Sequence, residues 1–187
     1  MEAIEELGKE HRAIGLMLRV LEAVSARIQR GERVAITDLD AMVEFLSVFA
    51  DQCHHGKEED FLFPALETAG IPRQGGPIGV MLDEHAQGRA LIARLREAIG
   101  GIESGKAAAS AEFASAAGDY VALLRRHIDK GNNVLFAMAE ARLSPIQDGE
   151  LCQAFEKLEL DRIGPGKHEE FHALLDRFRQ QYLANSR

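Results

Sequence analysis

The feature that most constrains the fold is an apolar seam whose positions recur at alternating steps of three and four residues. Residues spaced in this way share one face of an α-helix, and a continuous apolar face is stable in water only where another element covers it. Four separate stretches of the chain carry such a seam, so the sequence predicts long helices packed side by side. In the first stretch, about 2–29, the seam positions are Ile4, Leu7, His11, Ile14, Leu18, Leu21, Ser25 and Ile28.

The second predicted helix follows a short glycine-containing turn at residues 30–35. Thr37 or Asp38 can cap its first turn, because a side-chain oxygen at this position accepts a hydrogen bond from an otherwise unpaired backbone N–H. We expect the helix to extend to about Thr68, with Pro64 able to kink its last turns.

The stretch GIPRQGGPIG, residues 70–79, is the clearest break in the chain, since Gly and Pro interrupt regular structure. A third helix is expected from about residue 78 to 102 and a fourth from about 113 to 141, each with its own seam. Four long helices joined by short loops favour an up-down-up-down bundle.

After Pro145 the sequence predicts two shorter amphipathic helices, at about 150–161 and about 167–183, parted by the breaker GPG. We interpret them as a cap on the bundle. The predicted fold is therefore all-α: a four-helix bundle over about 2–142 with C-terminal capping helices over about 146–184, together forming a single domain, 1–187.

The charge balance excludes some partners. Lys and Arg number 22 against 30 for Asp and Glu, which gives a net charge of −8 and leaves no basic stripe for nucleic-acid phosphates. The first residues, MEAIEELGKEH, are acidic where a secretory signal is basic and apolar, and no apolar run reaches membrane-spanning length. We expect a cytoplasmic protein that binds neither nucleic acid nor membranes.

Four histidines fall one to each predicted helix: His11, His54, His85 and His127. With a rise of about 1.5 Å per residue, His11 and His54 lie 22 and 21 residues from Arg33 in the turn between them, and so at the same height. A similar count matches His85 with His127. Across the central loop the same count places His54 and His85 at heights that differ by about 10 Å, and the geometry of the loop must make up this difference.

Imidazoles on one level of an apolar interior are costly to bury unless each has a partner, and a shared metal cation satisfies all of them. Glu58 stands four residues after His54, on the same face of the second helix, and can join them as a ligand. The alternative for each residue is structural, a hydrogen-bonded core histidine or a surface ion pair of His54 with Glu58.

The segment CHHGKEEDFLFPAL, residues 53–66, resembles the hemerythrin-like family of HHE cation-binding domains. Alignment of its LFP with the family motif selects His54 and Glu58 as the ligand pair. The resemblance continues through EHRAI, GGPIGVMLDEHAQGR, HIDKGNNVLF and IGPGKHEEFH. It implies a four-helix bundle holding non-haem iron, usually two ions, that binds, senses or reacts with dioxygen, nitric oxide or peroxide.

Two positions depart from the family pattern. Arg89 stands where the oxygen-carrying members have a second histidine on the third helix. The resemblance is therefore to the bacterial four-histidine, two-glutamate branch, which is implicated in nitrosative stress and iron repair. Gly131 stands where the fourth helix has a second glutamate. We expect this glycine to leave room beside His127 for water, an exogenous ligand or another side chain.

Three outcomes of the missing glutamate stay open. Glu169 or His172 of the C-terminal segment can supply a ligand, although Phe171 and its apolar neighbours can equally dock that helix with its polar residues in water. The site can instead hold one metal, or zinc or manganese, since N and O ligands alone do not select iron. In the third case the fold persists without redox chemistry, as a helical interaction or stress-related protein.

Overall fold

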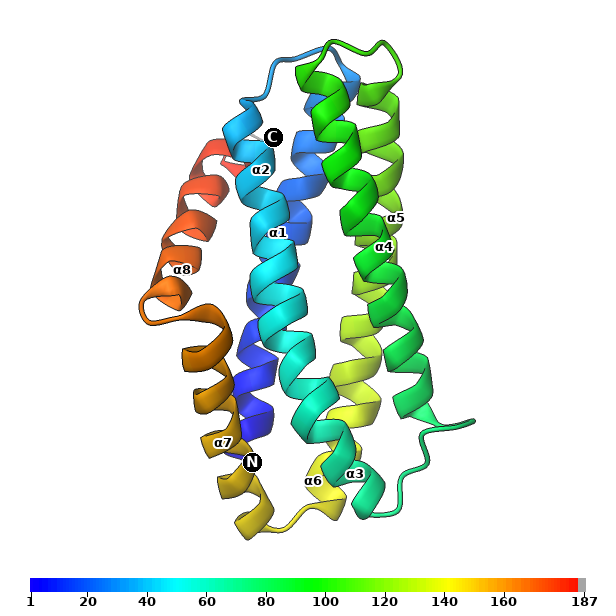
Figure 1. Cartoon of the computed structure of the whole chain (residues 1–187), viewed down its shortest axis with the longest axis vertical. Coiled ribbons are helices and arrows are strands. Elements are labelled where there is room, and N and C mark those ends of the chain that lie inside the picture. The colour runs from blue at the N-terminus through cyan, green and yellow to red at the C-terminus, as the bar shows by residue number, and fades with distance from the viewer. Residues whose placement is uncertain (185–187) are drawn as a thin grey trace.

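The computed structural model describes residues 1–184 and consists, over that part of the chain, of helices and their connections without a β-strand (Figure 1). Four long helical stretches alternate in direction, so the all-α bundle predicted from the sequence is confirmed. The second and the fourth of these stretches include π-helical segments, labelled η, in which the backbone winds more widely than in an α-helix. The stretches are α1 (Glu2–Gln29); α2 (Ile36–Phe45), η1 (Leu46–His55), η2 (Glu58–Leu62) and α3 (Phe63–Thr68); α4 (Pro77–Glu103); and α5 (Ala109–Lys130), η3 (Gly131–Leu135) and α6 (Phe136–Arg142).

The limits of α1 follow the sequence signals, whereas the predicted cap of α2 does not form. The α1 helix begins with Glu2 and Glu5 in its first turn and has Arg27 in its last, charges that suit the helix dipole at either end. The predicted capping of α2 by Thr37 or Asp38 is wrong, because the residue before the helix is Ala35 and no side chain caps it. Asp38 instead accepts hydrogen bonds from the far end of the chain.

The C-terminal segment forms α7 (Pro145–Leu158), η4 (Glu159–Ile163), α8 (Lys167–Phe178) and η5 (Arg179–Leu183). The α7 helix starts earlier than predicted because Ser144 and Gln147 form a capping box ahead of it. The break before α8 is where the GPG motif predicts it, since Gly164 and Gly166 both have positive φ, at 89° and 79°.

This appendage runs along the side of the bundle, against α1 and the second helical stretch, rather than over an end (Figure 1). The approach is close at Gly56, where an added Cβ would lie 2.9 Å from the Arg162 guanidinium and 3.3 Å from the Leu158 side chain. The tyrosine hydroxyl of Tyr182 donates to Asp38 at 2.5 Å and fixes the last turn of the appendage on α2.

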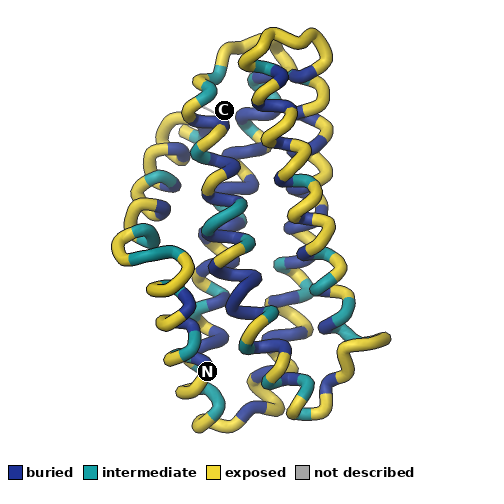
Figure 2. The backbone as a smooth tube through the Cα atoms, viewed as in Figure 1, coloured by how far each residue is buried: buried dark blue, intermediate teal, exposed yellow. Residues whose placement is uncertain are grey.

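The buried core consists of two apolar clusters, one toward each end of the bundle, and Figure 2 shows buried backbone along its whole length. On α1 the first cluster ends at Leu7 and the second begins at Ala13. The other three stretches divide at the same level, and the layer between the clusters is polar. No helix within residues 1–184 combines the length and apolarity that a membrane crossing requires.

Candidate metal centre

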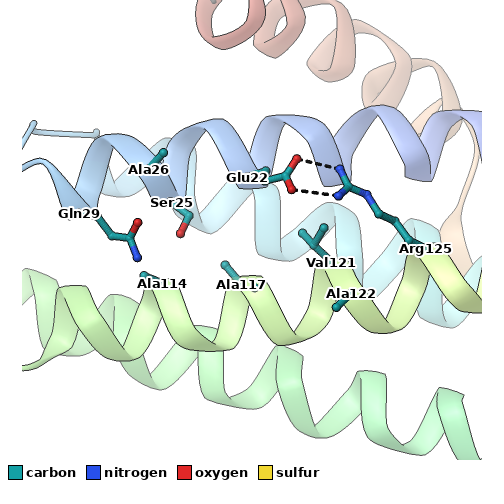
Figure 3. Close-up of a pocket in the computed structure, with 10 residues that line it drawn as sticks. Glu22, Ser25, Ala26, Gln29, Ala114, Ala117, Val121, Ala122 and Arg125 are labelled. Carbon is teal, nitrogen blue, oxygen red and sulfur yellow. Dashed lines mark hydrogen bonds and ion pairs between the residues drawn. The ribbon is translucent and has the colours of Figure 1, made fainter.

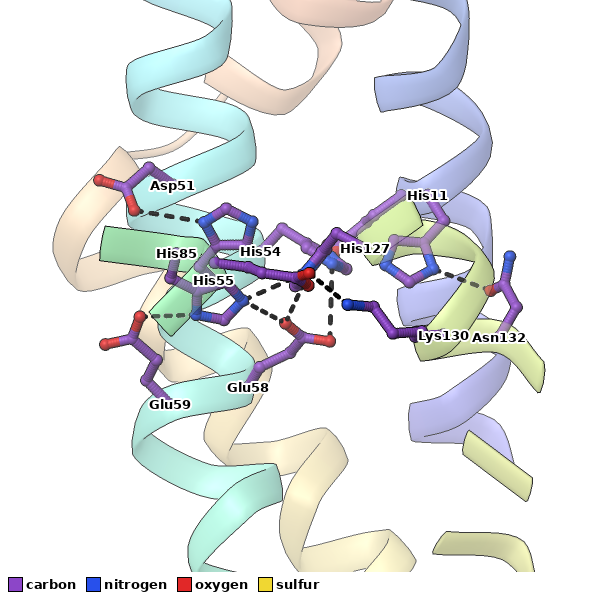
Figure 4. Close-up of polar contacts among 12 residues, drawn as sticks. His11, Asp51, His54, His55, Glu58, Glu59, His85, His127, Lys130 and Asn132 are labelled. Atoms are coloured by element: carbon purple, nitrogen blue, oxygen red, sulfur yellow. Dashed lines mark hydrogen bonds and ion pairs between the residues drawn. The ribbon is translucent and has the colours of Figure 1, made fainter. Parts of the chain in front are cut away.

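Five of the seven histidines converge in the polar layer (Figure 4). The four expected rings are present together: His11 from α1, His54 from η1, His85 from α4 and His127 from α5. His55, also from η1, is the fifth, and its ring centroid lies 3.8 Å from that of His85. Each of the five residues is at most 2% exposed. The height mismatch that residue counting left across the central loop is therefore absorbed.

Every one of these imidazoles has its Nδ1 atom hydrogen-bonded to an oxygen of another side chain. Carboxylate and amide oxygens accept, so we assign the ring hydrogen to Nδ1 in each case, which leaves Nε2 as the atom that faces inward. Partners of this kind fix the orientation of histidines that bind metals. The pairs are His11–Asn132 at 2.8 Å, His54–Glu10 at 2.7 Å, His55–Asp51 at 3.3 Å, His85–Glu59 at 2.7 Å and His127–Glu84 at 3.2 Å.

The inward-facing atoms are short of protein partners. Within residues 1–184, the Nε2 atoms of His11, His54 and His55 make no hydrogen bond, and neither do the two carboxylate oxygens of Glu58. Buried polar atoms without partners are rare in folded proteins because each costs about 1–3 kcal/mol. Their convergence in one layer, around Glu58, is the arrangement that bound cations satisfy.

The potential ligand atoms form two adjoining groups, within each of which they lie no more than 4.8 Å apart. One group is His11, His54 and Glu58, and the other is His55, His85 and His127. Glu58 also faces the second group, since its Oε2 lies 3.1 Å from His85 Nε2 and 3.8 Å from His127 Nε2. A single carboxylate therefore stands between two sets of imidazoles.

The electrostatics of the metal-free site depend on this carboxylate. Burial alone would raise the pKa of Glu58, but the surrounding imidazoles of His54, His127 and His85 hold it well below its usual range. Burial likewise acts to lower the pKa of His127, yet the carboxylates of Glu58 and Glu84 raise it to about 9. The metal-free site is therefore an ionised carboxylate that shares at least one proton with the imidazoles facing it.

The three other histidines of the layer have lowered pKa values and are neutral. Burial, together with the neighbouring ring of His54, lowers the pKa of His11 to about 3, and burial lowers that of His54 to about 3 as well. The pKa of His55 is held well below its usual value, first by burial and then by His85. Neutral imidazoles with free Nε2 lone pairs are the form that binds metal ions.

Gly131 explains how the layer accommodates the missing glutamate. A Cβ atom at this position would lie 2.7 Å from His11 Cε1, so the glycine leaves its space to the His11 ring. That ring also stacks on Phe136, with centroids 5.0 Å apart. The sequence left open whether water, an exogenous ligand or another side chain fills this space, and the structure shows that the His11 side chain fills it. A glutamate could not be restored here without moving His11.

The π-helical winding of η1 accounts for the fifth histidine. In a regular α-helix consecutive residues point about 100° apart, so only one of His54 and His55 would face the core. The wider π turn brings both rings inward, and π segments are frequent at functional sites. The adjacent pair HH is the one sequence signal of the inward position of His55.

A buried lysine joins the histidine layer to the appendage. The Lys57 ammonium is fully buried and contacts Glu10 and Glu159 at 2.5 Å and Glu6 at 2.6 Å. Glu10 in turn accepts from His54. Glu10, Glu159 and His168 also lie close enough to hold a metal ion, but the ammonium already supplies the positive charge there.

Two residues that the sequence offered as further ligands lie outside the layer. Glu169 and His172 are exposed on α8, and within residues 1–184 neither belongs to a group that could hold a metal ion. Tyr120, on α5, also lies outside the layer; it is fully buried, and its hydroxyl has no hydrogen-bond partner in that part of the chain.

A surface groove between α1 and α5 lies away from the histidines (Figure 3). Small residues such as Ala114 and Ala117 line it, and the double hydrogen bond of Arg125 to Glu22 crosses one end. Among the residues that the structure describes, no cluster of metal-ligating side chains opens into it. We therefore place the candidate site in the histidine layer.

A helical bundle whose middle layer is built from imidazoles and one carboxylate is a cation-binding architecture. Residues 2–139 match the family described as the hemerythrin HHE cation binding domain, and the chain belongs to that family. It is similar to the uncharacterized proteins Rv1995 of Mycobacterium tuberculosis and Mb2018 of Mycobacterium bovis, with 24% identity over 162 residues, or 87% of this chain. The chain spans 63% of the length of these relatives. No solved structure matches it.

Proposed function

We propose that this protein holds non-haem iron in the histidine layer and binds, senses or reacts with dioxygen, nitric oxide or peroxide there. The observation that carries the proposal is the convergence of unpartnered, buried Nε2 and carboxylate atoms in one layer of the bundle. Family membership supports it, since HHE domains are cation-binding helical proteins. The ligands proposed from the sequence are His11, His54, Glu58, His85 and His127, which all lie in this layer.

The donor set suits a borderline transition-metal ion. Imidazole nitrogens with one carboxylate favour Fe, Zn, Cu or Ni over the hard cations Mg²⁺ and Ca²⁺, which prefer oxygen. Zinc, which suits this donor set, and manganese, which the sequence leaves open, are measured beside iron. A bound iron ion with an open coordination position supplies the redox chemistry with small oxidants.

The protein residues hold the ligands in place and keep the site dry. Glu10, Asp51, Glu59, Glu84 and Asn132 bind the outer nitrogens of the five rings and fix their tautomers. Apolar clusters lie on both sides of the layer and exclude bulk water from it. This burial favours small uncharged ligands over larger substrates. We place the protein in the cytoplasm, in a response to oxidative or nitrosative stress, as a part of the same proposal.

The test is purification from iron-replete cells, followed by metal analysis and visible absorption before and after addition of dioxygen, nitric oxide or peroxide. We expect at least one equivalent of iron per chain and a charge-transfer band that changes with at least one of these reagents. Less than half an equivalent of any transition metal, without such a band, would contradict the proposal.

The alternative is a bundle that carries no metal and acts as an interaction or stress-related protein, and Gly131 is the feature that favours it. Thermal unfolding with and without a chelator separates the two. A ligand that binds only the native state raises its stability, by about 2.7 kcal/mol when its free concentration is 100 times Kd. An unfolding temperature that is the same in both conditions would support the metal-free alternative.

A further inference from the structure

We propose that His55 is itself a metal ligand, so that the layer holds two ions, one bound by His11, His54 and Glu58 and the other by His55, His85 and His127. This inference rests on the proposed function, because it specifies how the same site is filled. It assigns a direct role to a residue that the sequence motif passes over.

The first argument is that His55 has the same two-sided environment as the four other imidazoles. Its Nδ1 is bonded to Asp51 at 3.3 Å, while its Nε2 is buried and has no partner within residues 1–184. A core histidine that served only packing would have both nitrogens hydrogen-bonded or one exposed to water, because an unpaired buried nitrogen is costly.

The second argument is the number of ligands on each side of Glu58. Without His55, the group around His85 and His127 has only two imidazoles, with their Nε2 atoms 3.3 Å apart. With His55 it has three ligands, whose ligand atoms all lie within 4.8 Å of one another, and this equals the number of ligands in the group of His11, His54 and Glu58. Three protein ligands with a further position left open are what a catalytic metal site commonly has.

The third argument concerns Arg89, which does not enter the layer. Its guanidinium is 44% exposed and binds Asp51 at 2.8 Å and Glu59 at 3.1 Å. These two carboxylates are the Nδ1 partners of His55 and His85 respectively. Arg89 is thus a positioning residue that holds the carboxylates of Asp51 and Glu59 together. The third imidazole of the group, beside those of His85 and His127, therefore comes from η1 rather than from α4.

The experiment compares the wild-type chain with His55→Asn and His168→Asn. An asparagine amide can still donate to Asp51 as Nδ1 does, but it has no atom at the position of Nε2. His168 lies on α8, outside both groups around Glu58, and is the matched control. Each protein is stripped with chelator and titrated anaerobically with Fe²⁺ and separately with Co²⁺, whose visible absorption reports the number and type of ligands.

We expect two equivalents per chain in the wild type and in His168→Asn. In His55→Asn we expect one equivalent at unchanged affinity, and a second that is lost or weakened by at least about 100-fold, since even the loss of an outer partner costs 10–100-fold. Helical circular dichroism and the retained first equivalent establish that the variant is folded.

Two equivalents of unchanged affinity in His55→Asn would overturn the inference, as would a single equivalent in both the wild type and the variant. A wild type that takes up neither ion would instead refute the proposed function itself. The failure of the two proposals is therefore distinguishable.

Discussion

Replacement of Gly131 by alanine is the sharpest test of the packing inside the histidine layer. Alanine ordinarily stabilises a helix interior by about 0.5–1 kcal/mol relative to glycine, because the unfolded chain loses conformational freedom. At position 131, however, the added Cβ would lie 2.7 Å from His11 Cε1, at least about 0.7 Å closer than an ordinary contact of 3.4 Å. The substitution therefore sets helix propensity against a steric overlap.

The His11 ring cannot move aside freely. It is 2% exposed, stacks on Phe136 and is bonded to Asn132 through Nδ1. Inserting a methyl group into a packed core costs about 1–3 kcal/mol. We expect Gly131→Ala to lower the free energy of unfolding by about 0–2 kcal/mol once the gain in propensity is subtracted.

Gly118 supplies the matched control. It lies on α5 in the same helical stretch, and a Cβ there would have no neighbour within 4 Å. Gly118→Ala should therefore stabilise the protein by about 0.5–1 kcal/mol. Gly131→Ala should therefore have a lower free energy of unfolding than Gly118→Ala, by about 1–3 kcal/mol.

The assay is urea unfolding of the chelator-stripped proteins, followed by metal titration of both variants. Displacement of His11 should also weaken the metal held with His54 and Glu58, whereas Gly118→Ala should bind as the wild type does. If Gly131→Ala proves as stabilising as Gly118→Ala, then the His11 ring does not fill the space of the absent side chain, and our account of that glycine is wrong.

The remaining predictions concern hydroxyls, charge and protons. Tyr182→Phe should lower the free energy of unfolding in urea by about 1–2 kcal/mol, because the hydroxyl donates a hydrogen bond to Asp38. Tyr120→Phe should be neutral or stabilising, because its buried hydroxyl has no partner in the described chain. Equal losses of stability in the two variants would contradict this. Lys57→Met should lower the free energy of unfolding by about 3–5 kcal/mol, because it leaves the buried Glu10 carboxylate without its cation. A loss under about 1 kcal/mol would show that this buried ion pair contributes little to stability. Metal binding at pH 7 should release about one proton, because the pKa of His127 near 9 keeps the metal-free site protonated. The affinity for the metal should then rise as the pH approaches 9. Calorimetry in buffers of different ionisation enthalpy measures the proton release on metal binding. Identical heats of binding in such buffers would refute the predicted release.

The amino-acid sequence by itself determined the helices and the level of the histidines. Both depend on local spacing: seam positions repeat along one stretch, and residue counts to a turn fix the height of a side chain. His11 and His54 were matched in height from the sequence alone, and the GPG break was located correctly. These inferences need only the regular geometry of an α-helix.

Tertiary structure alone decided how the layer is filled. The inward turn of His55 depends on a shift of backbone hydrogen bonds from α to π winding, which side-chain spacing does not encode. That His11 takes the space at Gly131, and that Lys57 ties Glu10 to Glu159 of the appendage, depends on contacts between residues distant in the chain. Such contacts are set when whole helices pack, because packing density and charge pairing are properties of the assembled core rather than of any one segment.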